Sequence, residues 1–210
     1  MRHTFLKFPR TLISLVSGFI LFSVVVQLPF VHFFDFLIAT TIHNVRESFL
    51  DYGFVPFVIV GSIEVSVSGL FLFSMWLYRK GKFRKAYIVL AALLITTTIE
   101  FAMKQTLIHP EIPEEFRGRF PFMPFIGSAD IETNYSFPSG HSLRSMLLFG
   151  TLFMWQIRTN YFLWFIIIYA VIQCAGMNYY GFHWTSEVFG GYWLAVIALY
   201  CMNRSVQNEL

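Results

Sequence analysis

Charged residues are scarce in this chain of 210 residues, where aspartate, glutamate, lysine and arginine together make up 13%. A soluble domain normally carries nearer a quarter of such residues, so a molecule exposed to water on all sides is excluded. Hydrophobic residues make up 56% of the chain. They gather in uncharged runs of about 20 residues, the length that crosses a bilayer as a helix. The sequence therefore predicts an integral membrane protein.

Cysteine is nearly absent as well. Cys174 and Cys201 both lie inside apolar runs, which is not the pattern of a disulfide framework or of a thiolate metal site. Because no cluster of metal ligands is apparent, we expect no metal and no other cofactor, and we expect no nucleic-acid partner. The first apolar run is too long for a cleaved signal peptide and lacks a small-residue cleavage site, so we expect it to remain as the first span.

The apolar runs predict an all-α fold, a six-span transmembrane bundle in a single domain of residues 1–210. A mixed charged and aromatic segment after the first span fits a helix lying in the membrane interface. The one long polar connection joins spans three and four, and a loop of this length is more often functional than idle. The expected spans are residues 11–30, 54–78, 86–103, 141–157, 161–177 and 183–202, with the interfacial segment at 31–52 and the long loop at 105–137.

Lysines and arginines are unevenly divided between the two sides of the predicted bundle. The N-terminal head, the cluster at residues 79–85, Arg158 and the C-terminal tail would share one side, which carries Glu209 as its only carboxylate. The positive-inside rule makes this side cytoplasmic, with both termini on it. The interfacial segment, the long loop and a polar break at 178–182 then meet on the outer face. We expect a functional site there.

A turn rich in hydroxyl groups interrupts the apolar sequence at residues 134–144. Pro138 can start a helix, because its missing N–H would be unpaired there in any case. Ser139 and Gly140 leave backbone N–H groups open at this start, where the helix dipole also favours an anion. His141 places an acid–base group beside that anion site. On this stretch alone, a capped helix start with a chance histidine is an equal alternative.

The chain resembles the type 2 phosphatidic acid phosphatase superfamily, whose three motifs are K-x6-R-P, P-S-G-H and S-R-x5-H-x3-D. The second motif is complete at residues 138–141. The third matches at His183, keeps a carboxylate at Glu187 and is followed by the glycine pair at 190–191. The first matches at Lys104, where the third predicted span ends. The order and spacing of the motifs agree with the family.

This resemblance implies a role for each matching residue. His183 would be the nucleophile that attacks phosphorus, and Glu187, four residues on, would hold the far nitrogen of its ring. His141 would protonate the leaving alkoxide and then activate the hydrolytic water. The non-bridging phosphate oxygens would be held by Lys104, the Ser139 hydroxyl and the Gly140 N–H.

Two arginines of the family pattern are missing. Seven residues after Lys104 the chain has Glu111, and six residues before His183 it has Met177. Losing one such electrostatic contact typically costs on the order of 10²–10³ in rate. Either other cations substitute for these arginines, or turnover is low or absent. The candidate substitutes are Arg144, Arg117, Arg119 and, more weakly, His109.

Arg144 is the first of these candidates, because an arginine at the outer end of a span is costly unless it faces a polar cavity. A structural pairing of Arg144 with Glu64 or Glu100 is an equal alternative. Lys104 could likewise pair with Glu100, which lies one helical turn before it. Carboxylates within spans are functional candidates by default, although no chemical step can be assigned to Glu64 or Glu100.

The resemblance thus implies a metal-independent lipid phosphatase that hydrolyses a lipid phosphate monoester or diphosphate at the outer leaflet through a phosphohistidine. Its partners would be that lipid phosphate and the surrounding membrane lipids. The compactness of the chain and the family favour a bacterial plasma membrane. The missing arginines keep an alternative open, a lipid-phosphate binding or translocating protein of the same fold with little or no turnover. Phosphoryl transfer to an acceptor other than water is a third option.

Overall fold

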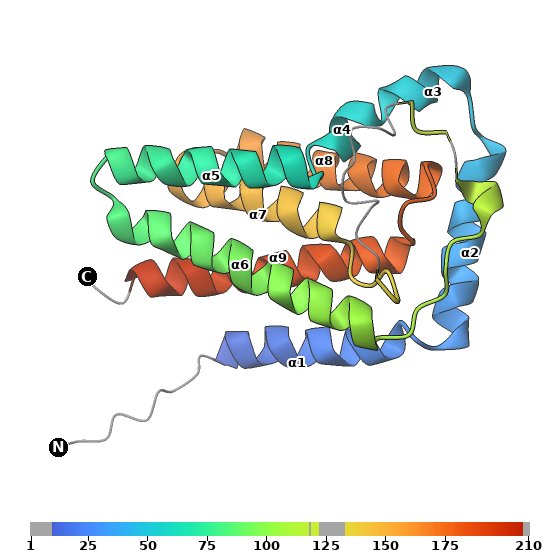
Figure 1. Cartoon of the computed structure of the whole chain (residues 1–210), viewed down its shortest axis with the longest axis horizontal. Coiled ribbons are helices and arrows are strands. Elements are labelled where there is room, and N and C mark those ends of the chain that lie inside the picture. The colour runs from blue at the N-terminus through green and yellow to red at the C-terminus, as the bar shows by residue number, and fades with distance from the viewer. Residues whose placement is uncertain (1–9, 118, 122–132, 208–210) are drawn as a thin grey trace.

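The computed structural model describes residues 10–117, 119–121 and 133–207, and the described residues form helices without any strand (Figure 1). The predicted all-α class is confirmed. In chain order the elements are α1 (Arg10–Val25), α2 (Pro29–Asn44), α3 (Ser48–Gly53), α4 (Val55–Ile59), α5 (Ile63–Arg79), α6 (Phe83–Thr106), the 3-10 turn η1 (Glu114–Phe116), α7 (Gly140–Trp155), α8 (Asn160–Tyr179) and α9 (Thr185–Gln207).

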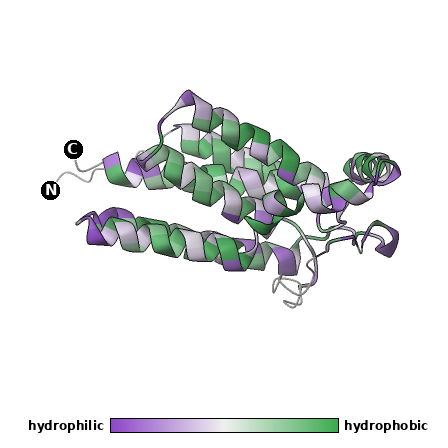
Figure 2. Cartoon of the chain, turned by 90° about the horizontal axis from the view of Figure 1, so that it is seen from above, coloured by the Kyte–Doolittle hydropathy of each residue, from purple (hydrophilic) through white to green (hydrophobic). Residues whose placement is uncertain are grey.

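Four stretches of the described chain are helical, long and apolar enough to cross a membrane. They are Ser48–Arg79, Phe83–Thr106, Asn160–Tyr179 and Thr185–Gln207. α1 and α2 pass the same test only as a pair, and that pair is bent by 82°. Hydrophobic residues occur along the whole length of these helices (Figure 2), and many of their large hydrophobic side chains are exposed. The protein is therefore a multi-pass membrane protein with four or five spans by this measure, and the number six stays a prediction.

Two of the predicted spans are interrupted. The first ends at Val25, and the chain bends into α2 at Pro29, because proline fits the first turn of a helix and not its interior. Figure 1 shows α2 crossing the end of the bundle, the placement expected of an interfacial helix. The second is divided between α4 and α5, and Ser62 caps α5 by accepting a hydrogen bond from the Val65 N–H.

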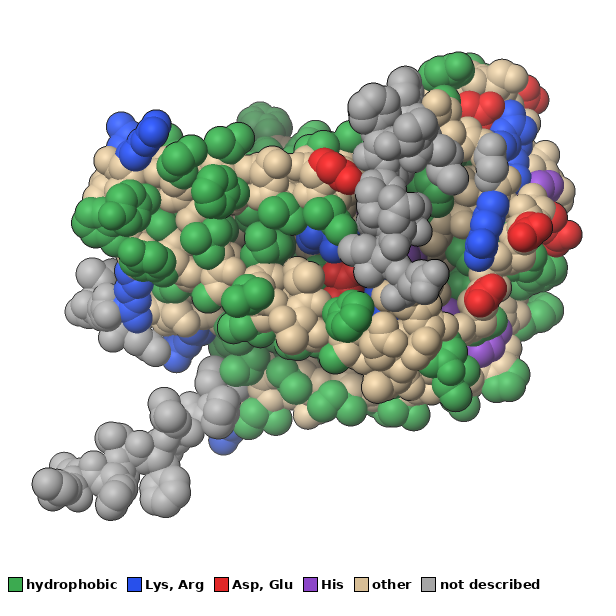
Figure 3. All heavy atoms as spheres, viewed as in Figure 1, with side chains coloured by type: hydrophobic (Ala, Val, Ile, Leu, Met, Phe, Trp, Pro, Cys, Tyr) green, Lys and Arg blue, Asp and Glu red, His purple; other side chains and the backbone are tan. Residues whose placement is uncertain are grey.

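The two ends of the bundle differ in charge, as the sequence predicts. The turn between α5 and α6 carries the basic cluster at 79–85 and lies at the same end as the start of α1 and the end of α9 (Figure 1). Histidine side chains gather toward the opposite end, where α2 and η1 lie (Figure 3). The assignment of the basic end to the cytoplasm stays a prediction.

α7 lies inside the bundle and packs most extensively against α9. It has 16 residues, which is about 24 Å of helix and so shorter than a hydrocarbon core of about 30 Å.

Glycines of α9 allow this helix to approach the start of α7 closely. A Cβ on Gly191 would lie 2.3 Å from the carbonyl oxygen of Ser139 and 3.0 Å from the backbone nitrogen of Leu143. The glycine pair after the third motif therefore lets two walls of the site meet.

Candidate active site

The carboxylate of Glu187 is the centre of the candidate site and is fully buried in the first turn of α9. Its Oε2 lies 2.7 Å from Nδ1 of His183 and accepts a hydrogen bond of 3.3 Å from the backbone N–H of Trp184. Its Oε1 accepts from the Ser136 hydroxyl and lies 2.8 Å from Nδ1 of His109. Four polar groups therefore surround this carboxylate, and such partners are what a buried charge requires.

His183 makes the predicted contact with Glu187, but from a turn rather than from a helix. α9 begins at Thr185, so His183 lies before it, in the connection from α8. Gly181 has φ +67° in that connection, a conformation that glycine adopts without steric cost. With Nδ1 of His183 held by the carboxylate, Nε2 is the ring nitrogen left for nucleophilic attack.

His141 is buried at the second position of α7, close to His183. The centroids of the two imidazole rings are 6.1 Å apart, and the rings are inclined by 61°. Arg144 and Lys104 are positively charged side chains that interact with it electrostatically. The structure therefore brings together both histidines that the motifs single out, from segments about 40 residues apart in the sequence.

The start of α7 differs in one detail from the prediction. The N-cap residue is Ser139, whose Oγ accepts a hydrogen bond of 3.4 Å from the backbone N–H of Ser142. Pro138 precedes this cap and so does not begin the helix. Gly140 is the first helical residue. The Ser139 hydroxyl, predicted to hold phosphate, is thus already a helix cap and also accepts a hydrogen bond from the hydroxyl of Ser142.

One carboxylate joins two of the predicted phosphate-binding cations. Glu100 Oε1 lies 2.9 Å from Nζ of Lys104, and Oε2 lies 3.0 Å from Nη1 of Arg144. The structural pairing that the sequence left open is therefore present for both cations. A Cβ on Gly140 would lie 2.0 Å from Glu100 Oε1, so this carboxylate lies directly against the start of α7. Two cations and one carboxylate leave one formal positive charge there.

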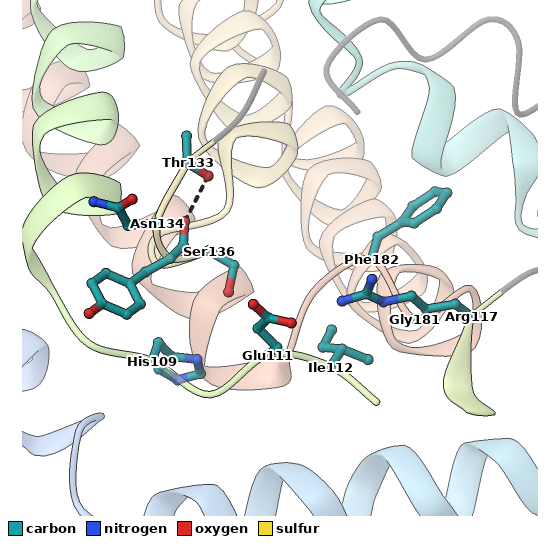
Figure 4. A pocket seen from close by; sticks show the side chains of 10 residues that line it. His109, Glu111, Ile112, Arg117, Thr133, Asn134, Ser136, Gly181 and Phe182 are labelled. Carbon is teal, nitrogen blue, oxygen red and sulfur yellow. Dashed lines mark hydrogen bonds between the residues drawn. The ribbon is translucent and has the colours of Figure 1, made fainter. Parts of the chain in front are cut away.

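The two loop arginines have different surroundings. Arg119 donates from Nε and Nη2 to the two carboxylate oxygens of Asp51, at 2.7 and 2.8 Å. Arg117 instead lines a cavity of about 420 Å³ together with Glu111, Ser136 and other residues. Figure 4 shows the Arg117 guanidinium and the Glu111 carboxylate directed toward each other across this cavity. Arg117 is therefore the loop arginine that a bound anion could reach.

Met177 stands where the family has one of its arginines, and its side chain packs in the apolar core. Met177 is fully buried in an apolar cluster with Val55, Val58, Tyr179 and Val188. No cation therefore replaces the family arginine at this point of the chain.

His109 occupies a place that its sequence position did not predict. It is buried, with Nδ1 on Glu187 and Nε2 3.2 Å from the Ser186 hydroxyl. The Ser186 hydroxyl and N–H in turn donate to Asp35 of α2. Sequence reasoning missed Asp35, Ser186 and Ser136. A single acid in the apolar and aromatic segment of α2 was the signal that could have indicated Asp35.

Within the described residues, no group of three or more histidine, cysteine or acidic side chains could hold a metal ion.

Two comparisons with known proteins point to the same superfamily. The family model of the PAP2 superfamily, the phosphatases that the motifs resemble, matches residues 105–210, half of the chain. A solved structure from Bacillus subtilis, described as the first transmembrane PAP2 type phosphatidylglycerolphosphate phosphatase, superposes with a TM-score of 0.75 at 16% sequence identity. The match covers 94% of this chain and 96% of the other, and it shows a shared fold. No curated protein matches the chain in sequence. The chain belongs to the PAP2 superfamily.

Proposed function

We propose that the chain is a membrane lipid phosphatase that hydrolyses a lipid phosphate monoester or diphosphate through a phosphohistidine on His183. The observation that carries this proposal is the 2.7 Å contact between Nδ1 of His183 and Oε2 of Glu187. It holds the imidazole in the tautomer whose Nε2 lone pair can attack phosphorus, and it stabilises the imidazolium that forms. Membership in the superfamily and the phosphatase activity named for the similar structure support the same reaction.

The two histidines have different roles in this reaction: His183 is the nucleophile, and His141 transfers the protons. Nε2 of His183 forms a bond to phosphorus while the bond from phosphorus to the leaving oxygen breaks, and His141 protonates that oxygen. The leaving oxygen belongs to the lipid alkoxide of a monoester or to the lipid monophosphate of a diphosphate. His141 then takes a proton from water, whose oxygen attacks phosphorus and breaks the P–N bond. Inorganic phosphate leaves, and both histidines return to their starting states. The 6.1 Å between the ring centroids leaves room for a phosphoryl group.

The phosphate oxygens would be held at the start of α7. Lys104, Arg144 and Glu100 together carry one positive charge there, and the N–H of Gly140 belongs to the first turn, where the helix dipole favours an anion. Arg117 would reach the phosphate from the adjoining cavity, although Glu111 faces it there and offsets part of its charge. This arrangement supplies fewer unpaired cations than the family motifs do, so we expect slow turnover.

The site would face the outer leaflet. The basic cluster at 79–85 lies at the opposite end of the bundle from the site, and basic clusters mark the cytoplasmic side. In this placement α2 crosses the bundle on the outer side, and a lipid would enter between helices so that only its phosphate reaches His183.

Phosphate release by purified protein tests the proposal. The substrates are phosphatidic acid, phosphatidylglycerol phosphate and an isoprenyl diphosphate, and the proteins are wild type, His183→Ala and the control His43→Ala. His43 lies on α2 and packs against Phe116 rather than within the site. We expect release by wild type and by the control, and none by His183→Ala. A base-stable, acid-labile label on wild type from ³²P-substrate would identify the phosphohistidine. Absence of release from every substrate would contradict the proposal.

The contacts of Glu100 favour one alternative. With Lys104 and Arg144 both paired with Glu100 and Met177 in place of a family arginine, less positive charge is left to stabilise the transition state than the family motifs supply, so a protein that binds or translocates lipid phosphates without hydrolysis would fit the same site. Binding of vesicles that contain phosphatidic acid, without phosphate release, is the result that would support this alternative.

A further inference from the structure

A continuous line of polar contacts extends behind His183, away from its Nε2. It runs from Glu187 Oε1 to Nδ1 of His109 (2.8 Å), and from Nε2 of His109 to the Ser186 hydroxyl (3.2 Å). The Ser186 hydroxyl donates to Oδ2 of Asp35 (2.5 Å), and the Ser186 N–H donates to Oδ1 (2.9 Å). All of these side chains are buried, with 8% or less of each residue exposed. Polar groups buried to this degree must satisfy one another.

We propose that His109 is a positioning residue for the phosphatase reaction, and that Asp35 positions His109. Nδ1 of His109 lies 2.8 Å from Oε1 of Glu187, which also accepts from the Ser136 hydroxyl, while Oε2 lies 2.7 Å from Nδ1 of His183. A glutamate side chain has three rotatable bonds, and a donor on each oxygen fixes the plane of its carboxylate. His109 thereby keeps Glu187 on His183 through the reaction. This inference rests on the proposed function.

The hydrogen-bond pattern requires one proton beyond those of a neutral histidine and an ionised aspartate. With Nδ1–H of His109 given to Glu187, a neutral ring presents a lone pair at Nε2. An ionised Asp35 also presents only lone pairs, yet the Ser186 hydroxyl between them has a single proton. Both contacts are hydrogen bonds only if a further proton resides on His109 or on Asp35.

This role differs from the one that the sequence indicated. From the sequence, His109 was a candidate to bind the substrate phosphate as a cation in place of a family arginine. In the structure, both of its ring nitrogens contact protein groups behind the nucleophile. A phosphate ligand would affect substrate binding, whereas a positioning residue affects the rate of the chemical step. The two roles therefore predict different changes in KM and kcat.

The test compares two substitutions of His109. His109→Asn keeps an N–H donor near the position of Nδ1, and His109→Leu removes it at similar volume. We expect His109→Leu to lower kcat about 10- to 100-fold, the range for partners that orient a functional histidine, with little change in KM. His109→Asn should recover most of that loss. Asp35→Asn and Asp35→Leu form a second pair, since asparagine can accept from the Ser186 N–H and donate to its hydroxyl, as a protonated aspartate would.

A second measurement does not depend on turnover. NMR of ¹⁵N-histidine-labelled protein, with the His183 signal assigned by its loss in His183→Ala, reports which ring nitrogen of His183 carries the proton. We expect the Nδ1–H tautomer in wild type and His109→Asn, and a mixture in His109→Leu. If wild type releases no phosphate, the proposed function fails while this measurement still decides the role of His109.

Three results would overturn the inference. The first is a raised KM with unchanged kcat in His109→Leu, which would make His109 a phosphate ligand. The second is equal loss of kcat in His109→Leu and His109→Asn when both have the wild-type elution profile and melting temperature in detergent, which would indicate packing alone. The third is an unchanged His183 tautomer in His109→Leu.

Discussion

Lys104 and Arg144 bind the same carboxylate, that of Glu100, at 2.9 and 3.0 Å. The carboxylate lies against Gly140 at the start of α7, the place where the second motif is expected to receive an anion. Glu100 is therefore a built-in anion beside the two cations that a substrate phosphate needs. Its charge lowers the attraction of the site for phosphate, and it also pairs with the buried Arg144 and the partly buried Lys104.

Glu100→Gln should strengthen anion binding and weaken the fold. Removing the negative charge leaves both cations for a bound anion, and we expect the inhibition constant of vanadate to fall about tenfold, which is about 1.4 kcal/mol. Loss of the carboxylate that pairs with the buried Arg144 should also lower the melting temperature. Addition of phosphate should raise it more in Glu100→Gln than in wild type. An unchanged inhibition constant would show that Glu100 lies outside the anion site.

Glu187→Gln should reduce kcat by about 10³- to 10⁴-fold, comparable to loss of the carboxylate in a serine protease triad. The amide cannot stabilise the imidazolium of His183 and can favour the wrong tautomer. Glu187→Asp keeps the charge and restores the family residue, so it should retain more activity. The measurement is kcat for phosphate release. Similar rates for Glu187→Gln and wild type would exclude a triad-like role.

Arg117→Ala should weaken substrate binding, because its guanidinium lines the cavity beside Ser136 and Phe182. A charge-assisted hydrogen bond contributes about 1.5–3 kcal/mol, and a partly solvated one lies at the low end. We expect KM to rise about tenfold. Arg119→Ala is the matched control, since Arg119 is engaged with Asp51 and should leave KM unchanged. Equal effects of the two substitutions would point to general loop damage.

Gly191→Ala should destabilise the packing of α9 on the start of α7. The new Cβ would lie 2.3 Å from a backbone oxygen of Ser139, which cannot move without shifting the second motif. Overpacking of this kind costs about 1–3 kcal/mol. Gly53→Ala is the control, because a Cβ at Gly53 meets nothing within 4 Å. The melting temperature in detergent should fall for the first variant and stay near wild type for the second.

The sequence correctly predicted those structural features that a short local pattern of residues identifies. Apolar runs predicted the helices, and the pattern of His141, His183 and Glu187 predicted which side chains would meet. The errors lie at helix boundaries, at Pro29, Ser62 and the start of α7. Local turn chemistry decides those points, and hydrophobic runs do not show it.

By itself, the sequence determined that the chain is a helical membrane protein with two histidines and a carboxylate in the motif positions of its family. The tertiary structure decided which charges remain available. It placed Lys104 and Arg144 on Glu100, Arg119 on Asp51, and His109 on Glu187. Apart from Lys104 and Glu100, which lie one helical turn apart, these pairings join side chains that are distant in sequence, and they depend on the burial that makes an unpaired charge costly. A sequence states which ionisable groups exist, and only the packed helices decide which of them neutralise one another.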